Sequence, residues 1–374
     1  MKKVSISQVD ALFANGSYPI ELLLVYQDGF STKRLRRALQ KLAPVFWPVF
    51  GEYDDGVLSF ERYREEDFFD EESVGHAFDP AEAEASGQSI ISRFGQKELG
   101  KLFFLKATRF TNGLALVPKM NHVAGDGYSY FLFLSALAAL TRAALFPFSA
   151  PLIKAMFKPD HRRTGLKKFS FRAEGPGPAV PGDRLTIETV EIPKREVQAL
   201  VREAAVDNNL RVSSNDVLSA MAVKKLAGIP GGTSGTGFRL TIPIDVRGRI
   251  KDYGRRFFGN GIMLHSLELG REMSTDLSVK ETAARIRRSM LRVSREGYVR
   301  YLTELERIID EKRWEEFRPY DPEKGCLVTN LSKLPAERLD FGTGGPHAIV
   351  PLTVEKNSVA VLARRENYVL RYTY

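Results

Sequence analysis

The segment MNHVAGDG, residues 120–127, carries the side chains of this chain that are best suited to chemistry. His122 lies four residues before Asp126, and Gly125 and Gly127 stand on either side of the aspartate. A neutral imidazole can take a proton from a hydroxyl or an amine, because its unperturbed pKa lies near neutrality. The same spacing also fits half of a metal site, a base with an orienting carboxylate, or a polar strand-to-helix turn whose glycines adopt positive φ.

Other kinds of catalytic or binding site lack residues that they require. A metal site needs further ligands, and no metal is expected because the remaining histidines are isolated in the sequence: His76, His161, His265 and His347. The segment GYSYF after the motif does not form the Gly-x-Ser-x-Gly elbow of a serine hydrolase. The glycine-rich segment at 231–237 lacks the Gly-Lys-Ser/Thr ending of a phosphate loop, so a flexible loop is predicted. The single cysteine, Cys326, excludes an internal disulfide and is interpreted as a small buried strand residue.

The charge of the chain raises the question of an anionic partner. The net charge of +9 suits a nucleotide-bearing cofactor, a nucleic acid or an acidic membrane, and it also suits a soluble protein that is merely basic. No basic block with interleaved aromatic residues is present, so no nucleic acid is expected as a partner. Basic residues cluster modestly at 244–259, IDVRGRIKDYGRRFFG.

Two stretches bear on location. The first residues, MKKVSISQVDALF, have two lysines but no apolar region behind them, which is not typical of a secretory signal. The longest apolar stretch, 128–148, is interrupted by Thr141 and Arg142 and predicts a buried helix rather than a membrane span. The cytoplasm is the expected location, and the protein is expected to be a monomer.

The elements that must position the motif have an α/β pattern. A length of 374 residues favours two domains. In the first half we predict a strand at 19–27 and a helix at 32–46, capped by Ser31 or Thr32. Two hairpins follow, one at 51–63 that turns at Asp55-Gly56 and one at 101–123 that turns at Asn112-Gly113, and then a helix at 128–143. The motif follows the second hairpin directly and precedes the last helix.

A stretch rich in proline, glycine and charge, 147–184, predicts an interdomain connection between an N-terminal domain, 1–146, and a C-terminal domain, 185–374. In the second half we predict strands at 184–192, 237–246, 261–269, 325–332 and 347–354 and a hairpin at 358–374. Helices are predicted at 193–208, at 213–228 and within 277–317.

Taken together, several blocks resemble the BAHD acyltransferases, within the superfamily of chloramphenicol acetyltransferase and the condensation domains. The family's His-x-x-x-Asp-Gly motif is matched by HVAGDG at 122–127, and its Asp-Phe-Gly-Trp-Gly motif by DFGTG at 340–344, with Thr343 in place of tryptophan. Weaker matches are IDVRGR, FFGNGI, ISQVDALF and LRRALQKLAPVFWPVFGEY, at 244–249, 257–262, 6–13 and 35–53. Their order and rough spacing agree with the family over nearly the whole chain, which is shorter than the plant members.

The resemblance implies an α/β fold of two similar chloramphenicol-acetyltransferase-like domains, with mixed sheets flanked by helices and a solvent channel between them. It implies that His122 is the general base, which deprotonates the acceptor for attack on the thioester of an acyl-coenzyme A. Asp126 is then a scaffold residue that pairs with Arg247, and Gly127 completes the motif. An oxyanion donor is expected at Thr329, with Asn330 as the alternative; Leu331 stands where many members carry tryptophan.

The resemblance also assigns structural and binding positions. Asp340 and Gly342 are expected to shape a loop at the channel mouth. Cations and free N–H groups suit the phosphates of coenzyme A, and the candidates are Arg255, Arg256, Ser213, Ser214 and Asn215. No permanently bound cofactor is expected; acyl-coenzyme A is a co-substrate, and the second partner is a small-molecule alcohol or amine.

Two rival functions stay open. One is a condensation-type enzyme whose acyl donor is bound to a carrier protein; those relatives usually carry a second histidine just before the motif, where this chain has Asn121. The other is a non-catalytic protein that kept the fold. Neither the acyl group nor the acceptor can be named from the sequence.

Overall fold

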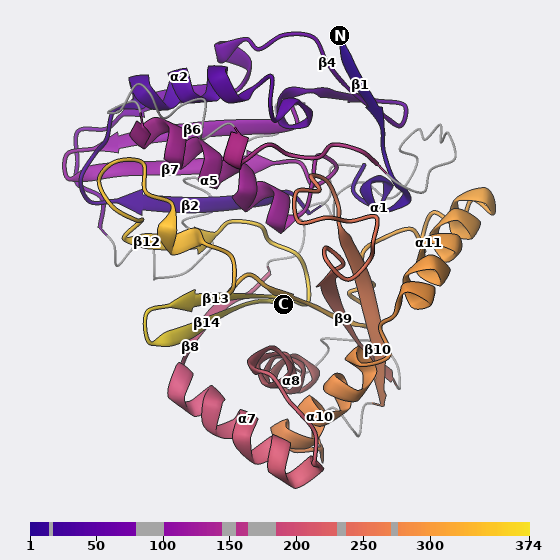
Figure 1. The fold of residues 1–374 in the computed structure, drawn as a ribbon. Coiled ribbons are helices and arrows are strands. Elements are labelled where there is room, and N and C mark those ends of the chain that lie inside the picture. Colours follow the sequence, from indigo (N-terminus) through magenta and orange to yellow (C-terminus); the bar gives the residue numbers. More distant parts are fainter. Residues whose placement is uncertain (15–17, 80–100, 144–154, 164–184, 230–236, 271–275) are drawn as a thin grey trace. The chain divides into compact units, whose positions relative to one another are not determined.

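The structure, a computed structural model, describes residues 1–14, 18–79, 101–143, 155–163, 185–229, 237–270 and 276–374. The chain forms two compact units (Figure 1). The first unit comprises Met1–Pro178, Arg247–Gly261 and Leu334–Thr353, and the second comprises Ala179–Val246, Ile262–Lys333 and Val354–Tyr374. Each unit is described by itself below.

The first unit contains a five-stranded sheet in the order β12-β2-β7-β6-β5, antiparallel except for the β5–β6 pair. Its strands are β2 (Ile20–Tyr26), β5 (Phe69–Ser73), β6 (Phe103–Phe110), β7 (Gly113–Met120) and β12 (Ala348–Pro351). A smaller sheet, β1-β4-β3, contains β1 (Lys2–Ser5), β3 (Glu52–Asp54) and β4 (Val57–Phe60). The helices are α1 (Gln8–Ala11), α2 (Thr32–Leu42) and α5 (Gly127–Ala143).

Local sequence explains most of these elements. Ser31 caps α2 by accepting a hydrogen bond from the backbone N–H of Arg34, and α2, whose apolar residues are buried, packs against α5. Asp55 and Gly56 both have positive φ, as a two-residue hairpin turn requires. The second hairpin turns one residue earlier than expected, because Phe110 pairs with Gly113 and Gly113 is already a strand residue.

The second unit contains a six-stranded sheet in the order β10-β9-β11-β13-β14-β8. Its strands are β8 (Ile187–Pro193), β9 (Gly237–Asp245), β10 (Ile262–Gly270), β11 (Gly325–Asn330), β13 (Ser358–Arg364) and β14 (Asn367–Thr373). The helices are α7 (Lys194–Asn208), α8 (Ser214–Ala227), α10 (Val279–Met290) and α11 (Arg295–Asp310). Strand β11 runs parallel to both of its neighbours, and the other pairs are antiparallel.

The two faces of this sheet differ in what they carry. Alternate strand residues, among them Cys326 and Val328, enter the apolar core that α7, α8 and α10 cover. Successive strand side chains point to opposite faces, so Thr329 lies on the face turned away from these helices. Thr329 pairs with Ala360, and Ala360 pairs with Arg371, which places all three in one row across the sheet.

The compact units differ from the contiguous division at 1–146, 147–184 and 185–374 that the sequence predicts. Two segments of the second half, Arg247–Gly261 and Leu334–Thr353, belong to the first unit. The reason is long-range pairing: β12 extends the first sheet by pairing with β2, and Arg247 forms an ion pair with Asp126. Most of the predicted connection and residues 230–236 lie outside the described residues.

Among the described residues, no helix combines the length and apolar composition that a membrane crossing needs. In the same ranges, no group of three or more His, Cys, Asp or Glu side chains is placed to hold a metal ion.

Candidate active site

The motif residues form the turn between β7 and α5. Strand β7 ends at Met120 and α5 begins at Gly127. Within the turn, the Asn121 side chain accepts a hydrogen bond from the backbone N–H of Val123 at 3.0 Å, and the backbone N–H of Ala124 donates to the carbonyl of Asn121. His122 therefore projects from a tight turn at the end of a buried strand.

The two glycines do not have the role that the sequence suggested. Neither Gly125 nor Gly127 adopts a positive φ, so the expectation of left-handed backbone in the turn was wrong. A Cβ on Gly125 would lie 2.8 Å from the Cβ of Ser129 and 3.5 Å from the Cα of Gly259. Close packing of the turn against α5 and the 247–261 segment explains the glycine at this position.

The imidazole of His122 is half-buried and stacks on Phe13, with ring centroids 3.8 Å apart and an interplanar angle of 24°. Burial lowers the pKa of His122 below its ordinary value. The charge of Asp126, the residue's own backbone carbonyl, the Asn260 side chain and Asp10 act in the opposite direction but do not outweigh burial. His122 is therefore neutral at pH 7, the form that can accept a proton.

Asp126 forms a bidentate ion pair with Arg247, at 2.8 Å from Nη1 to Oδ2 and 2.9 Å from Nη2 to Oδ1. The pair is almost fully buried, with side-chain exposures of 2% for Arg247 and 3% for Asp126. Asp126 also accepts hydrogen bonds from the backbone N–H groups of Ser129, at the start of α5, and of Gly261. Burial raises the pKa of Asp126, but the charge and hydrogen bonds of Arg247 outweigh this and hold it below its usual value.

Both oxygens of Asp126 are thus used by the scaffold. No hydrogen bond joins Asp126 to His122 among the described residues, so the geometry is not that of a triad in which a carboxylate orients the imidazole.

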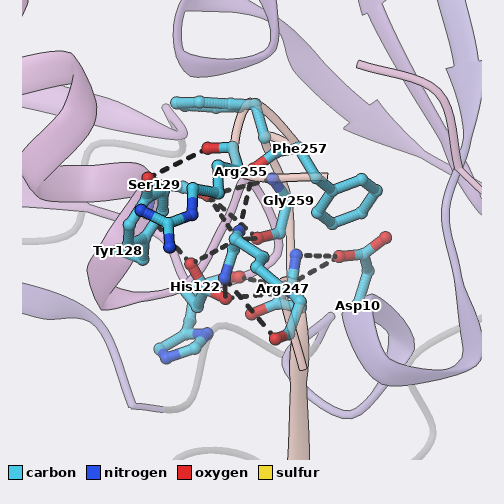
Figure 2. Close-up of polar contacts among 12 residues, drawn as sticks. Asp10, His122, Tyr128, Ser129, Arg247, Arg255, Phe257 and Gly259 are labelled. Atoms are coloured by element: carbon cyan, nitrogen blue, oxygen red, sulfur yellow. Dashed lines mark hydrogen bonds and ion pairs between the residues drawn. The ribbon is translucent and has the colours of Figure 1, made fainter. Parts of the chain in front are cut away.

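Arg247 connects the motif to the 247–261 segment (Figure 2). Its Nε donates to the carbonyl of Phe257 at 3.0 Å, and its Nη2 donates to the carbonyl of Gly259 at 2.9 Å and to the hydroxyl of Ser129 at 3.1 Å. The guanidinium also lies over the ring of Tyr128, 4.6 Å from its centroid. Ser129 closes this network by donating from its hydroxyl to the carbonyl of Gly259.

A second buried network joins Asp10, Asn260 and the backbone carbonyl of His122, and the sequence did not reveal it. Asp10 is fully buried; its Oδ1 accepts from the backbone N–H of Asn260 at 3.1 Å and from Asn260 Nδ2 at 2.8 Å. Asp10 also forms a buried ion pair with Arg163, whose guanidinium donates to the carbonyl of Phe258. The available signal was a lone aspartate and a lone asparagine within the family-like blocks ISQVDALF and FFGNGI.

The two candidates for the oxyanion donor, Thr329 and Asn330, differ in their surroundings within the second unit. The Asn330 side chain faces α8, where its Nδ2 donates to Asn215 at 2.7 Å, and its Oδ1 accepts from the backbone N–H of Ser332 at 2.9 Å. Thr329 lies on the opposite face, and its hydroxyl makes no hydrogen bond among the described residues. Of the two candidates, Thr329 is therefore the one whose hydroxyl is available to donate a hydrogen bond.

The start of α8 is less open than expected for a phosphate site. Ser213 donates from both its backbone N–H and its hydroxyl to the buried carboxylate of Asp216, which also pairs with Arg287. Ser214 accepts from Gln198, and Asn215 accepts from Asn330. A carboxylate already lies at this helix terminus, so phosphate binding by Ser213, Ser214 and Asn215 stays a prediction.

The sequence predicted that the DFGTG segment belongs to the C-terminal domain, but in the structure it lies in the first unit. Asp340 accepts from the backbone N–H groups of Gly342 and Gly344 at 2.7 and 2.9 Å, and it pairs with Arg142 at the end of α5. Gly342 has a φ of 127°, which favours glycine. Phe341 stacks on Phe30, with centroids 5.1 Å apart. These contacts hold a compact loop against the first sheet.

Arg255 and Arg256 belong to the same unit as His122, and both side chains are exposed. Their backbone carbonyls accept hydrogen bonds from the hydroxyl of Tyr128 and from the backbone N–H of Asp160, respectively. The structure therefore fixes the backbone at these two positions and leaves both guanidinium groups at the surface.

Comparisons with known proteins agree with this fold. Crystal structures of TRI101 from F. graminearum, complexed with coenzyme A and deoxynivalenol, and of vinorine synthase superpose with TM-scores of 0.77 and 0.73. The identities are 15% and 17%, and the superpositions cover 100% of this chain in both cases and 95% and 90% of the respective relatives. The fold is that of the chloramphenicol-acetyltransferase-like proteins.

Sequence comparison identifies the family. Residues 83–367 match the profile of the Transferase family, and the chain belongs to this family, that of the BAHD acyltransferases. Piperamide synthase from Piper nigrum is 22% identical over 274 residues, which cover 71% of this chain. The matched region spans 57% of the length of that relative.

Proposed function

We propose that the protein transfers an acyl group from acyl-coenzyme A to the hydroxyl or amine of a small molecule, with His122 as the general base. The observation that carries the proposal is the imidazole of His122, which projects from a rigid turn and has a pKa lowered by burial. Family membership and the coenzyme A bound to TRI101 support the choice of acyl donor.

In the proposed reaction, Nε2 of neutral His122 takes the proton of the acceptor hydroxyl or amine. The acceptor oxygen or nitrogen attacks the thioester carbonyl carbon, and the carbonyl oxygen becomes an oxyanion. The intermediate then collapses, the C–S bond breaks, and the protonated His122 returns its proton to the thiolate of coenzyme A. No acyl-enzyme forms, which agrees with the absence of a nucleophile hydrogen bonded to His122 among the described residues.

Thr329 is the donor that we propose for the oxyanion. Its hydroxyl is uncommitted among the described residues, whereas the amide of Asn330 is held at both ends. The guanidinium groups of Arg255 and Arg256 are proposed to contact the phosphates of coenzyme A, since both are exposed cations.

The name of piperamide synthase points to amide formation, while the acceptor complexed with TRI101 is deoxynivalenol. We therefore propose both alcohols and amines as acceptors. A carrier-protein donor is less well supported, because the position before the motif is Asn121, whose side chain is used inside the turn.

The test is a panel of acyl-coenzyme A donors against alcohols and amines, read as thiol release. With the best substrate pair, His122→Ala should lower turnover by about 10²–10⁴-fold, the usual contribution of a general base. His76→Ala changes an exposed histidine and is the matched control. Near-normal turnover of the His122 variant would refute the assignment of the base.

A further inference from the structure

Arg371, in strand β14 of the second unit, is a buried arginine without a counter-charge. Its side chain lies on the sheet face opposite the apolar core, because its neighbours Leu370 and Tyr372 enter that core. The residue is only 5% exposed. Its Nε and Nη2 atoms are buried, and among the described residues the guanidinium has no hydrogen bond and no ion pair. Burial is accordingly the only cause that acts on the pKa of Arg371, and it lowers this pKa to about 10.

Other buried guanidinium groups of this chain are compensated. Arg247 pairs with the carboxylate of Asp126, and Arg163 pairs with the carboxylate of Asp10. A buried charge without a partner destabilises the folded state, because neither water nor an opposite charge solvates it. Arg371 therefore differs from Arg163 and Arg247 in lacking an anion that the chain itself supplies.

Two glutamates of the neighbouring strand β8 lie near Arg371, but both of their carboxylates are used elsewhere. Glu188 accepts a hydrogen bond from Lys225, which belongs to α8. Glu191 accepts from Arg364, which belongs to β13. The strand beside Arg371 therefore does not provide its counter-charge.

Arg371 shares its row of the sheet with Thr329, the proposed oxyanion donor. Ala360 lies between them and pairs with both. Neighbouring strands are about 4.8 Å apart, so the backbones at Thr329 and Arg371 are separated by roughly 10 Å. The methyl group of Ala360 is too short to separate the two flanking side chains. An anion bound to the guanidinium would thus lie only a few bonds from a carbonyl group held by Thr329.

The charge and shape of this site suit a carboxylate. A guanidinium takes up one negative charge, and its planar fork matches a carboxylate with two parallel hydrogen bonds. The described strands of this sheet place two other arginines on the same face, Arg239 and Arg364, and these pair with Glu268 and Glu191. A phosphate group carries up to two charges and would find only one uncompensated cation on these strands.

We infer that Arg371 binds a carboxylate group of one of the two small-molecule substrates, on the sheet face where Thr329 lies. The substrate class is then a hydroxy acid or an amino acid as acceptor, or a dicarboxylic acyl group on the donor. The inference rests on the proposed function in taking the ligand to be a substrate. The anion site itself is a property of the resting protein.

Thiol release tests the inference and identifies the substrate that carries the carboxylate. In the donor arm, succinyl-coenzyme A is compared with butyryl-coenzyme A, which has a methyl group in place of the carboxylate. In the acceptor arm, hydroxybenzoates and aminobenzoates are compared with their methyl esters. In one arm the wild-type protein should prefer the acid, and Arg371→Met should lower this preference in kcat/KM by about 10–100-fold, because a charge-assisted hydrogen bond is lost.

Two further variants separate the guanidinium from a general effect of charge. Arg371→Lys keeps the charge but loses the fork, so its preference should lie between those of the wild-type protein and Arg371→Met. Arg211→Met removes an exposed arginine of the second unit and should leave the preference unchanged. A wild-type protein that prefers the uncharged member in both arms overturns the inference, whatever the variants do. So does a preference for the acid that persists in Arg371→Met.

Anion binding to the resting protein provides a readout without turnover. Sodium acetate should raise the melting temperature of the wild-type protein more than sodium chloride of the same ionic strength does, and Arg371→Met should lose this excess. The variant is expected to fold, because an apolar side chain replaces an uncompensated buried charge. An equal effect of acetate on both proteins overturns the site, and so does an Arg371-dependent excess that appears with phosphate but not with acetate.

The two proposals fail in different ways. If no pair of donor and acceptor releases thiol while the acetate effect depends on Arg371, the proposed function fails and the anion site stands. If His122→Ala abolishes turnover while Arg371→Met changes neither the substrate preference nor the acetate effect, only the inference about Arg371 fails.

Discussion

Removal of either partner of the Asp126–Arg247 pair should destabilise the protein and lower its activity together. Asp126→Ala leaves the Arg247 guanidinium, only 2% exposed, without its counter-charge. Breaking one side of such a buried pair costs about 3–5 kcal/mol, because the surviving charge cannot be solvated. Loss of the hydrogen bond to the backbone N–H of Ser129 at the start of α5 adds about 1 kcal/mol.

Arg247→Ala should cost a similar amount. It leaves the Asp126 carboxylate buried and also removes donors to the carbonyls of Phe257 and Gly259. The double variant lacks both charges, so its destabilisation should be less than the sum of the single variants by about 2–3 kcal/mol. Asp126→Asn is the matched control: it keeps the shape of the side chain and an acceptor for one backbone N–H, and it removes the charge and replaces the second acceptor oxygen by a donor.

The free energies of unfolding of all four variants should be measured in urea at pH 7.5, together with thiol release on the best substrate pair. The reasoning is refuted by strict additivity of the two single substitutions. It is also refuted if Asp126→Ala retains the wild-type melting temperature and loses only turnover, because that is the behaviour of a residue that orients the imidazole.

Three further outcomes are expected. Burial lowers the pKa of His161 to about 4, so the free energy of unfolding should fall by about 3 kcal/mol as the pH falls from 6.5 to 4, because the unfolded chain binds a proton that the folded chain does not. In urea titrations at several pH values, His161→Gln should lose most of this pH dependence. An unchanged pH dependence in the variant contradicts the prediction. The Nε and Nη2 atoms of buried Arg371 lack partners among the described residues, so Arg371→Met should raise the free energy of unfolding by on the order of 1–3 kcal/mol; a decrease contradicts this. Free coenzyme A should raise the melting temperature in a salt-sensitive way, less so after Arg255→Gln or Arg256→Gln, and no shift at millimolar coenzyme A would favour a carrier-protein donor.

The elements that could be predicted from the sequence are those whose signals are local. The cap at Ser31, the turn at Asp55-Gly56 and the alternation in the 358–374 hairpin each depend on neighbouring residues, and each is present. Local signals could not predict that the 247–261 and 334–353 segments belong to the first unit. Ala348 pairs with Val25, and nothing in the composition of a four-residue strand indicates a partner so distant in the sequence.

The residues of the candidate site also differ in whether the sequence could indicate their roles. The Asp126–Arg247 pair was predicted because the motif and IDVRGR resemble blocks of a known family, and the pair is present. The roles of Asp10 and Asn260 depend on three segments meeting in space, and an isolated aspartate or asparagine has no pattern that indicates such a meeting. The motif glycines were misinterpreted as positions of positive φ, and at Gly125 close packing, which favours the same residue, is the reason for the glycine.

The composition of the first unit from three separate stretches of chain has a consequence for recombination between relatives. A chimera joined once, within residues 164–184, would take Asp126 and Asp10 from one parent and Arg247 and Asn260 from the other. The Arg247–Gly261 segment of one parent would then have to pack against the β7–α5 turn of the other parent. Strand β12 of one parent would likewise have to pair with strand β2 of the other. A functional chimera should therefore require that Arg247–Gly261 and Leu334–Thr353 come from the same parent as the N-terminal part of the chain. A fragment that ends at Pro178 should not form the site unless these two segments are added as separate peptides.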